Sequence, residues 1–508
     1  MAEKETPTIK VFPEEITIEN FKSIRHLTLR PKPGVNVLVG PNMAGKTNIL
    51  EALHLLSKAL SQSELLKTPY LPHLPQYWGP EDLFFMRRVE NPIGFELLFR
   101  VMMMRREAYF KHYVRFAVKF ALSRGRETIE PSYMSIAWET ADKEFTAKLE
   151  VGDGEVRVCI NPRYVSEYVD FIKKVRVRED VFKLFIDEII NKINELSKKS
   201  AGLETKLIEE LVIAQRAIES QFLRSFLISP FIHIFHIPPA SLGNGFNEFY
   251  LGMMFSTFFM PIPILILIKW GLANPGEFRG VLYDTTIALP NLSTLINTTI
   301  RIFLERSVLL KHPDISAISE PQPFTGEEQL DVRARNLPQV FYKLSAEGRT
   351  EYISTVLREA FGGVSVEPRS AAGRVFLVIR ERGIELPPPN IADGLIKALA
   401  VASAIELRPT MLLIDEVENS LHVRALKVIY DVLNSLEIPV IIATHSPALV
   451  DMAEPERVFV VSRGDDGGTV VEPPYGDLER LKRRLSELGV SLSDYVLYSR
   501  TWGAGGSG

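Results

Sequence analysis

The chain has 508 residues, which at about 150 residues per domain predicts roughly three structural units. Apolar residues make up 46% and charged residues 24%, a balance that is typical of globular proteins and excludes a largely disordered chain. The net charge of −4 excludes a globally basic nucleic-acid binder but leaves a local basic patch open. The single cysteine, Cys159, cannot form an internal disulfide, and the N-terminus lacks an apolar signal-peptide core, so we expect a cytoplasmic protein.

The N-terminal region predicts strands, a glycine-containing loop and then a helix. Three short strands are expected, over residues 16–21, 27–30 and 35–39. The third strand ends at Gly40, and a helical pattern runs from Lys46 to about residue 60. Apolar and polar residues alternate repeatedly over residues 93–160, which we expect to form antiparallel strands. One predicted apolar face of these strands contains Phe116, Val118, Phe120 and Leu122.

Residues 100–126 are locally basic and have aromatic residues between the charges. They hold eight Lys or Arg residues, namely Arg100, Arg105, Arg106, Lys111, Arg115, Lys119, Arg124 and Arg126, against one acid, Glu107. Phosphate contact combined with base stacking would use such a set. A solvated face of an antiparallel sheet with its aromatic residues in the core explains the pattern equally simply, and we favour that interpretation.

The middle of the chain, residues 161–345, predicts a helical insertion. Apolar residues recur at spacings of three and four over residues 182–196 and again over residues 203–218, which indicates an antiparallel helical hairpin. Residues 312–337 are rich in proline, glycine and acids and predict a surface linker.

An apolar segment within this insertion leaves two interpretations open. Residues 225–268 contain one formally charged side chain, Glu248, and the uncharged part is long enough to span a bilayer. Pro261 and Pro263 would break a single helix there. We therefore favour a buried core or a partner interface, with membrane contact as the alternative.

The C-terminal third alternates between strands and helices. The predicted strands cover residues 374–380, 411–414 and 440–443, and the predicted helices cover residues 393–405 and 421–436. This βαβ alternation predicts an α/β fold with a largely parallel sheet and helices on both faces. The sequence thus divides into an N-terminal part, residues 1–160, the insertion, residues 161–345, and a C-terminal part, residues 346–508.

The loop after the strand at residues 35–39 has the pattern G-x-x-x-x-G-K-[ST]. Its residues are Gly40, Pro41, Asn42, Met43, Ala44, Gly45, Lys46 and Thr47, followed by Asn48 in the helix. Glycines let backbone N–H groups surround phosphate oxygens, and the helix N-terminus favours negative charge. Lys46 is predicted to reach the β- and γ-phosphates of ATP, and the Thr47 hydroxyl is predicted to ligate Mg²⁺.

Acidic and imidazole side chains follow two of the predicted C-terminal strands. Four apolar residues precede Asp415, so this carboxylate is expected at the end of a buried strand, where it can support Mg²⁺. Glu416 comes next and is suited to accept a proton from the attacking water. His445 ends the following strand, where it can contact the γ-phosphate or the water. We therefore predict catalytic roles for Lys46, Glu416 and His445.

With these motifs in place, the chain resembles the ABC-type ATPase heads of the SMC and recombination-repair group. The similar segments are Asn20-Phe-Lys-Ser23, the loop from Gly40 to Thr47, Ala392-Asp-Gly394, Asp415 to His422 and Ala443-Thr-His-Ser-Pro447. The resemblance is greatest to the AAA-labelled branch related to overcoming-lysogenization-defect (OLD) ATPases, whose members act in genome maintenance or anti-phage defence.

The resemblance implies an ABC-type P-loop ATPase head with an antiparallel β subdomain and an inserted helical domain. Two heads of that group enclose two ATP molecules, which implies an ATP-dependent homodimer or a higher oligomer. Asp393 and Gly394 correspond to the signature loop, which serves the nucleotide of the partner head, and His445 to the switch histidine. The expected function is an ATP-hydrolysing switch in DNA repair or defence that acts with DNA and a separate effector protein.

The sequence also departs from the family pattern. Ala392 stands where the signature usually has serine, Val417 and Val423 replace frequent prolines, and Gln76 is the candidate for the glutamine loop. OLD nucleases carry a Toprim nuclease domain after the switch histidine, whereas 63 residues follow His445 here, so we expect no nuclease activity. The alternative function is a membrane- or partner-docked regulatory ATPase that does not bind DNA.

Overall fold

The structure is a computed structural model that describes residues 8–61, 79–105, 108–122, 129–139, 145–152, 155–160, 303–381, 383–386, 392–472, 483 and 485–497. The predicted helical hairpin, the apolar segment 225–268 and Gln76 lie outside the described residues. The chain divides into two compact units. One comprises Met1–Phe12, Leu97–Lys119 and Pro131–Arg301, and the other Pro13–Glu96, Phe120–Glu130 and Ile302–Gly508.

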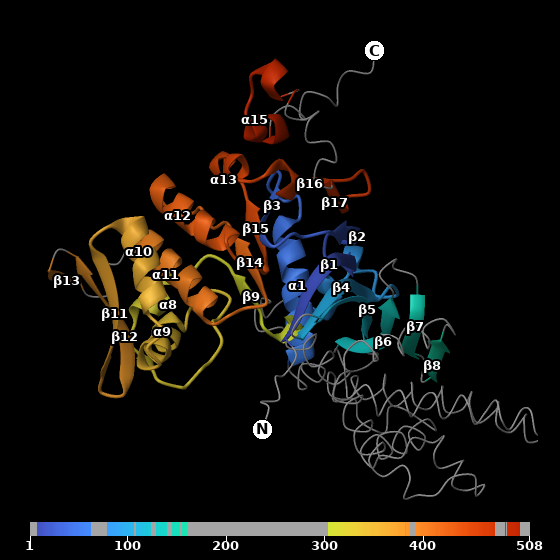
Figure 1. Cartoon of the computed structure of the whole chain (residues 1–508), viewed down its shortest axis with the longest axis horizontal. Coiled ribbons are helices and arrows are strands. Elements are labelled where there is room, and N and C mark those ends of the chain that lie inside the picture. The colour runs from blue at the N-terminus through green and yellow to red at the C-terminus, as the bar shows by residue number, and fades with distance from the viewer. Residues whose placement is uncertain are drawn as a thin grey trace, which may run out of the picture. The chain divides into compact units, whose positions relative to one another are not determined.

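A six-stranded sheet forms the centre of the second unit (Figure 1). Its order is β17 (Thr469–Glu472), β16 (Val458–Arg463), β3 (Gly34–Val39), β15 (Pro439–Thr444), β14 (Met411–Asp415) and β9 (Ser307–Leu310). All neighbours pair in parallel except β16 and β17. The predicted parallel sheet of the C-terminal third is therefore confirmed, and strand β3 from the N-terminal part lies inside it. Strand β9 belongs to the same sheet although it precedes the expected boundary at residue 346.

Helices cover both faces of this sheet because apolar side chains point alternately to each side of every strand. Val37, Val39 and Ile414 pack in one buried cluster with α12 (Val423–Asn434) and α13 (Pro447–Met452). The intervening Leu38 and Leu413 are also buried but lie outside that cluster. Helix α1 (Lys46–Ser61) packs against β9, β14 and β15. The predicted helix after Gly40 is thus confirmed.

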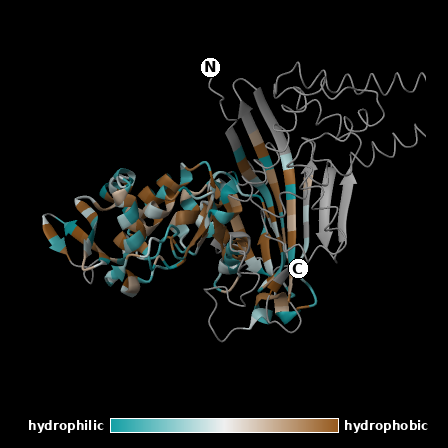
Figure 2. Ribbon diagram, turned by 90° about the horizontal axis from the view of Figure 1, so that it is seen from below, coloured by the Kyte–Doolittle hydropathy of each residue, from teal (hydrophilic) through white to brown (hydrophobic). Residues whose placement is uncertain are grey.

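A second sheet is antiparallel and has the order β2, β1, β4, β5, β6, β7, β8. The strands are β1 (Thr8–Phe21), β2 (Ile24–Leu29), β4 (Ile93–Arg105), β5 (Ala108–Leu122), β6 (Ile129–Glu139), β7 (Phe145–Gly152) and β8 (Glu155–Ile160). Hydrophobic residues recur along its long strands (Figure 2). Phe116, Val118 and Phe120 are buried and Leu122 is partly buried, which confirms the predicted apolar face.

Strand β12 (Arg374–Glu381) belongs to neither of these sheets. It pairs antiparallel with β11 (Val364–Ala371), β10 (Gln322–Pro323) and β13 (Ile384–Leu386) in a separate four-stranded sheet. Helices α8 (Ile315–Ser319), α9 (Leu337–Ala346), α10 (Glu351–Phe361) and α11 (Asp393–Glu406) accompany it, and α15 (Leu492–Leu497) follows near the C-terminus. The predicted strand exists, but its place in the parallel sheet was wrong because short connections pair it antiparallel with β11 and β13.

The prediction of a surface linker over residues 312–337 was wrong. Ile318, Leu330, Val332 and Ala334 in this segment are all buried. Backbone bonds close the segment on itself, since Lys311 N donates to the Val332 oxygen (2.8 Å) and Asp314 N to the Arg333 oxygen (2.8 Å). The proline- and acid-rich composition reflects exposed positions between these buried anchors.

Among the described residues, none of the helices has the length and apolar character needed to cross a membrane.

Candidate functional site

The loop between β3 and α1 requires glycine at both ends because other parts of the chain pack directly against it. A Cβ atom on Gly40 would lie 1.9 Å from the Val461 main-chain oxygen. Gly45 has φ +104°, and a Cβ atom there would lie 2.0 Å from Thr469 Oγ1. Between them Pro41, Asn42 and Met43 are exposed. The loop between β3 and α1 is therefore fixed at its two ends and exposed in its middle, at the end of β3.

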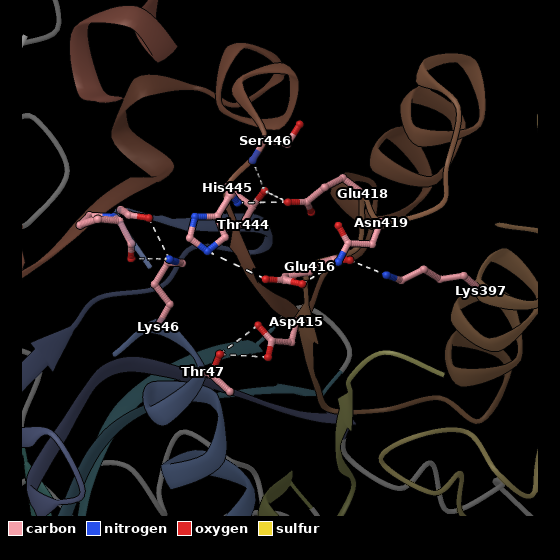
Figure 3. Close-up of polar contacts among 12 residues, drawn as sticks. Lys46, Thr47, Lys397, Asp415, Glu416, Glu418, Asn419, Thr444, His445 and Ser446 are labelled. Atoms are coloured by element: carbon pink, nitrogen blue, oxygen red, sulfur yellow. Dashed lines mark hydrogen bonds and ion pairs between the residues drawn. The ribbon is translucent and has the colours of Figure 1, made fainter. Parts of the chain in front are cut away.

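Lys46 turns back towards this loop (Figure 3). Its Nζ donates to the main-chain oxygens of Gly40 (2.8 Å) and Pro41 (3.0 Å), and the residue is 6% exposed. Burial lowers the pKa of Lys46 to about 8, although Asp415, Glu416 and Glu418 favour the charged form. A partly desolvated ammonium at the centre of such a loop is suited to phosphate, because an anion would restore its lost solvation.

Thr47 and Asp415 form the part of the site that suits a hard divalent cation. Thr47 Oγ1 donates to Asp415 Oδ2 (3.0 Å), with Oδ1 at 3.3 Å. Burial is the largest influence on Asp415 and raises the pKa of its carboxyl group. A hydroxyl and a desolvated carboxylate are the oxygen ligands that Mg²⁺ accepts, with its other positions left to phosphate and water. The residues therefore fit the predicted Mg²⁺.

Glu416 follows Asp415 in an unusual backbone conformation. Its φ is +52°, in the left-handed region that residues other than glycine rarely adopt. Glu416 N donates to the Ala443 oxygen (2.8 Å), and the side-chain amide of Asn419 donates to Glu416 Oε2 (2.6 Å). His445 Nε2 lies 3.9 Å from Glu416 Oε1. The carboxylate is thus presented beside the predicted switch histidine.

Glu418 anchors the loop that carries His445. One carboxylate oxygen, Oε1, accepts hydrogen bonds from Thr444 Oγ1 (2.5 Å) and from the His445 main-chain N–H (3.1 Å). The other oxygen, Oε2, is buried without a hydrogen-bond partner in the described part of the chain. Burial, followed by the charge on Lys46, lowers the pKa of His445, so the imidazole is neutral near pH 7.

A row of alternating charges lies next to the carboxylate of Asp415. Glu51 in α1 pairs with both Lys22 and Lys311. Burial alone would raise the pKa of Glu51, but the two lysines outweigh it and the pKa is lowered. Lys311 follows β9 and also favours the charged form of Asp415. This row therefore supplies positive charge beside the predicted Mg²⁺ site.

The predicted signature residues lie at the N-terminus of α11. Ala392 is the N-cap residue and has no side-chain capping bond; Ala392 and Asp393 are exposed. A Cβ atom on Gly394 would lie 2.3 Å from the Ser420 main-chain oxygen, so glycine lets α11 pack directly on the loop after β14.

In the P-loop helix, Asn48 Nδ2 donates to Ser23 Oγ (2.7 Å), which orients the segment after β1 rather than the loop itself.

The structure brings Lys46, Thr47, Asp415, Glu416 and His445 into one cluster (Figure 3). Sequence reasoning gave no role to four residues of this region, namely Glu418, Thr444, Lys397 and Lys311, although the first two lie within segments that carry the resemblance. Lys397 could have been noticed in the sequence, since it is the one charged residue among the apolar and small residues 394–405. Glu418 was visible as a third acid close to Asp415, whereas nothing in the local sequence marked Lys311.

Comparisons with known families give two matches. The profile described as "AAA domain, putative AbiEii toxin, Type IV TA system" matches residues 196–451, which is half of the chain. A second profile, described as "AAA domain", matches residues 15–63 and so contains the loop and α1.

Individual relatives match over short stretches. "DNA replication and repair protein RecF" of Azotobacter vinelandii is 40% identical over 58 residues, which cover 11% of this chain and 16% of that protein. RecF of Porphyromonas gingivalis is 40% identical over 88 residues, 17% of this chain and 23% of that protein. The chain thus matches less than a quarter of the length of either relative. Among solved structures, a Pyrococcus furiosus Smc head domain bound to the C-terminal domain of ScpA aligns with 94% of this chain and 100% of its own, at 14% identity and a TM-score of 0.37.

Proposed function

Because the chain belongs to the AAA-domain family that carries the description "putative AbiEii toxin, Type IV TA system", we propose that it binds and hydrolyses ATP as a molecular switch. Its fold and motifs are those of the ABC-type P-loop ATPases of the SMC and RecF group. The observation that carries the proposal is the contact of Thr47 with Asp415, beside the buried ammonium of Lys46. In this proposal these groups would place phosphate binding and metal binding in one site, with Glu416 next to Asp415 for the attacking water.

In this proposal the loop holds the phosphates of ATP. Lys46 exchanges its two carbonyl acceptors for oxygens of the β- and γ-phosphates, and the exposed loop amides donate to the same groups. Thr47 and Asp415 would hold Mg²⁺, which when bound neutralises charge that develops on the transferred phosphoryl group. Their existing hydrogen bond already sets the two ligands side by side.

Glu416 and His445 act on the attacking water. The Glu416 carboxylate accepts a proton from the water or orients it, and Asn419 fixes one of its oxygens. His445 is neutral, so its Nε2 can share a hydrogen bond with the water or the γ-phosphate without adding positive charge beside Lys46. Glu418 keeps the imidazole in place through the main chain of its loop.

We further propose that ATP joins two copies of the chain. Ala392 and Asp393 are exposed at the N-terminus of α11, and the first N–H groups of a helix suit an anion. A Cβ atom on Gly394 would lie closest to Ser420 and Leu421. In the ABC-type arrangement that the sequence resembles, this helix serves nucleotide in the site of a partner. An ATP-dependent homodimer is therefore the expected active form.

Two outputs of such a switch are open to test. One is a DNA-linked role with a separate effector, and the name of the RecF relatives, "DNA replication and repair protein", supports repair as its setting. The alternative is a regulatory ATPase docked to a membrane or a protein partner that does not bind DNA. The family description "putative AbiEii toxin, Type IV TA system" favours neither output over the other.

The experiment combines ATP hydrolysis with DNA binding. Purified protein should hydrolyse ATP only with Mg²⁺, and it should retain DNA in a salt-dependent manner, since released counterions drive phosphate contacts. Binding to DNA at low salt that weakens steeply with added salt supports the DNA-linked role. Hydrolysis without any DNA binding, with or without ATP, favours the docked alternative. Absence of ATP binding contradicts the proposed function as a whole.

A further inference from the structure

One charged side chain lies inside the buried part of α11. Every residue of this helix from Gly394 to Ala404 is buried, and Lys397, which is 3% exposed, is the charged residue among them. Removing an ammonium group from water is unfavourable unless acceptors and opposite charges surround it. The contacts of Lys397 should therefore explain why it occupies this position.

Lys397 reaches out of α11 to the loop that carries the proposed water-activating carboxylate (Figure 3). Its Nζ donates a hydrogen bond to the main-chain oxygen of Glu416. Burial lowers the pKa of Lys397 to about 8, although the carboxylates of Glu418, Glu416 and Asp415 favour its charged form. Lys397 thus contacts neither the P-loop nor the metal-binding carboxylate but the backbone of Glu416.

The backbone of Glu416 needs such support. With φ +52° the residue occupies a region that is sparsely populated without glycine, and such conformations persist where surrounding contacts fix them. Three contacts fix this one: Glu416 N donates to the Ala443 oxygen (2.8 Å), Asn419 N donates to the Glu416 oxygen (3.2 Å), and Lys397 donates to that same oxygen. Since φ sets the direction of the Cα–Cβ bond, these contacts also set where the carboxylate lies.

We propose that Lys397 is a positioning residue: it holds the main-chain oxygen of Glu416 and thereby places the Glu416 carboxylate at the attacking water. The inference rests on the proposed function, because Glu416 has this task only if the site hydrolyses ATP. The competing explanation is structural, namely that Lys397 merely fastens α11 to the loop after β14. The two explanations differ in which step of turnover a substitution at Lys397 affects.

The test uses Lys397→Met, which keeps the length and apolar stem of the side chain but removes its donors. Misplacing a catalytic group by about 1 Å costs on the order of 100-fold in rate, so we expect kcat to fall about 10- to 100-fold. The dissociation constant for ATP should change by less than about threefold, because Lys397 does not touch the P-loop. Ser403→Ala is the matched control, since Ser403 is buried in the same helix and its hydroxyl has no hydrogen-bond partner in the described chain.

A double substitution separates positioning from folding. Glu416→Gln alone should already remove most hydrolysis, and in that background Lys397→Met should cause no further fall in the single-turnover rate. A Lys397→Met variant that hydrolyses ATP at the rate of the unaltered protein overturns the inference. So does an equal fall in both backgrounds, because that pattern indicates a general structural role. If Lys397→Met does not fold, Lys397→Gln, which keeps an N–H donor, takes its place. Its effect on the single-turnover rate is then compared between the unaltered protein and the Glu416→Gln background in the same way.

Failure of the proposed function gives a different result. If the unaltered protein does not hydrolyse ATP, or if Glu416→Gln hydrolyses it at the same rate as the unaltered protein, the role of Glu416 is wrong and the inference falls with it. If both behave as expected while Lys397→Met is fully active, the inference alone is overturned and the proposed function stands.

Discussion

Thr47 and Asp415 are 368 positions apart in the sequence, yet the hydroxyl of one lies 3.0 Å from the carboxylate of the other. The contact exists because β15 separates β3 from β14 in one parallel sheet, so the loops after these strands meet at the same edge. The two ends of the chain therefore build a single site. Substitutions in either end should affect the same steps of nucleotide binding and turnover.

Lys46→Ala should abolish ATP binding while the fold persists. Among the described residues, the ammonium donates hydrogen bonds to the loop carbonyls of Gly40 and Pro41 alone, so its loss removes the charge that the phosphates need without opening the core. Isothermal titration with Mg-ATP measures the binding, and circular dichroism checks the fold. Lys427→Ala, at an exposed lysine of α12 that pairs with Asp431, is the control and should bind ATP normally. If Lys46→Ala still binds ATP, the loop from Gly40 to Thr47 is not part of the nucleotide site.

The sequence predicted the local elements of the site because each follows from a short pattern. A strand that ends in glycine before a lysine and a threonine specifies its own loop and helix, and four apolar residues before Asp415 specify a buried strand end. These patterns need no information about distant residues. The order of the strands in the sheet, in contrast, was not predicted from the sequence.

The supporting residues could not be predicted in the same way, because their partners come from other elements. Glu418 is local to Asp415, but its task depends on Thr444 and His445 at the end of β15. Lys311 acquires its position only when β9 pairs with β14. The segment 312–337 was misread because composition averages over buried anchors such as Leu330 and Val332. Tertiary contacts of this kind are decided by packing and not by local pattern.

Glu51→Gln should destabilise the fold more at neutral pH than in acid. The lysines on either side lower the pKa of Glu51 below its usual 4.5, so its stabilisation is fully present above about pH 4.5 and is lost as the pH falls through the lowered value. Hydrogen bonds to a charged group are worth roughly 1.5–3 kcal/mol each, which sets the expected loss in the free energy of unfolding at pH 7. Urea unfolding at pH 7 and pH 3.5 measures the difference. Glu359→Gln, at an exposed carboxylate of α10, should show no loss at either pH. An equal loss at both values would contradict an electrostatic origin.

Glu418→Ala should reduce turnover more than nucleotide binding. It removes the acceptor of Thr444 Oγ1 and of the His445 N–H, so the imidazole loses its fixed position while the P-loop keeps its contacts. We expect kcat to fall about 10-fold or more, with an ATP dissociation constant within about threefold of the unaltered protein. Thr444→Val should have a smaller effect in the same direction, and the double variant should be less severe than the product of the two. Thr355→Val is the control, since in the described chain that hydroxyl donates to the Glu351 oxygen and accepts from Arg358, both within α10. Independent, multiplicative losses would show that Glu418 does not act through the histidine loop.

The last prediction concerns ATP-dependent dimerisation. Glu416→Gln keeps the size of the side chain but cannot accept a proton from water, so ATP should stay bound and intact. If the exposed N-terminus of α11 binds the nucleotide of a partner, this variant with Mg-ATP should shift towards a dimer in size-exclusion light scattering. Lys46→Ala should remain monomeric under the same conditions, because it retains α11 but lacks the nucleotide.

Ala392 allows a sharper form of the same experiment. As the N-cap residue of α11 it offers no hydroxyl, and a transition-state donor of this kind is worth about 100-fold or more in rate. Ala392→Ser should therefore raise the ATPase rate or the dimer population, and the gain should vanish when Lys46→Ala is combined with it. A Glu416→Gln variant that stays monomeric at saturating ATP, together with no effect of Ala392→Ser, would contradict a site shared between two heads. An oligomer of fixed size that ignores nucleotide would contradict ATP-driven association but would leave the roles of Lys46, Thr47 and Asp415 untouched.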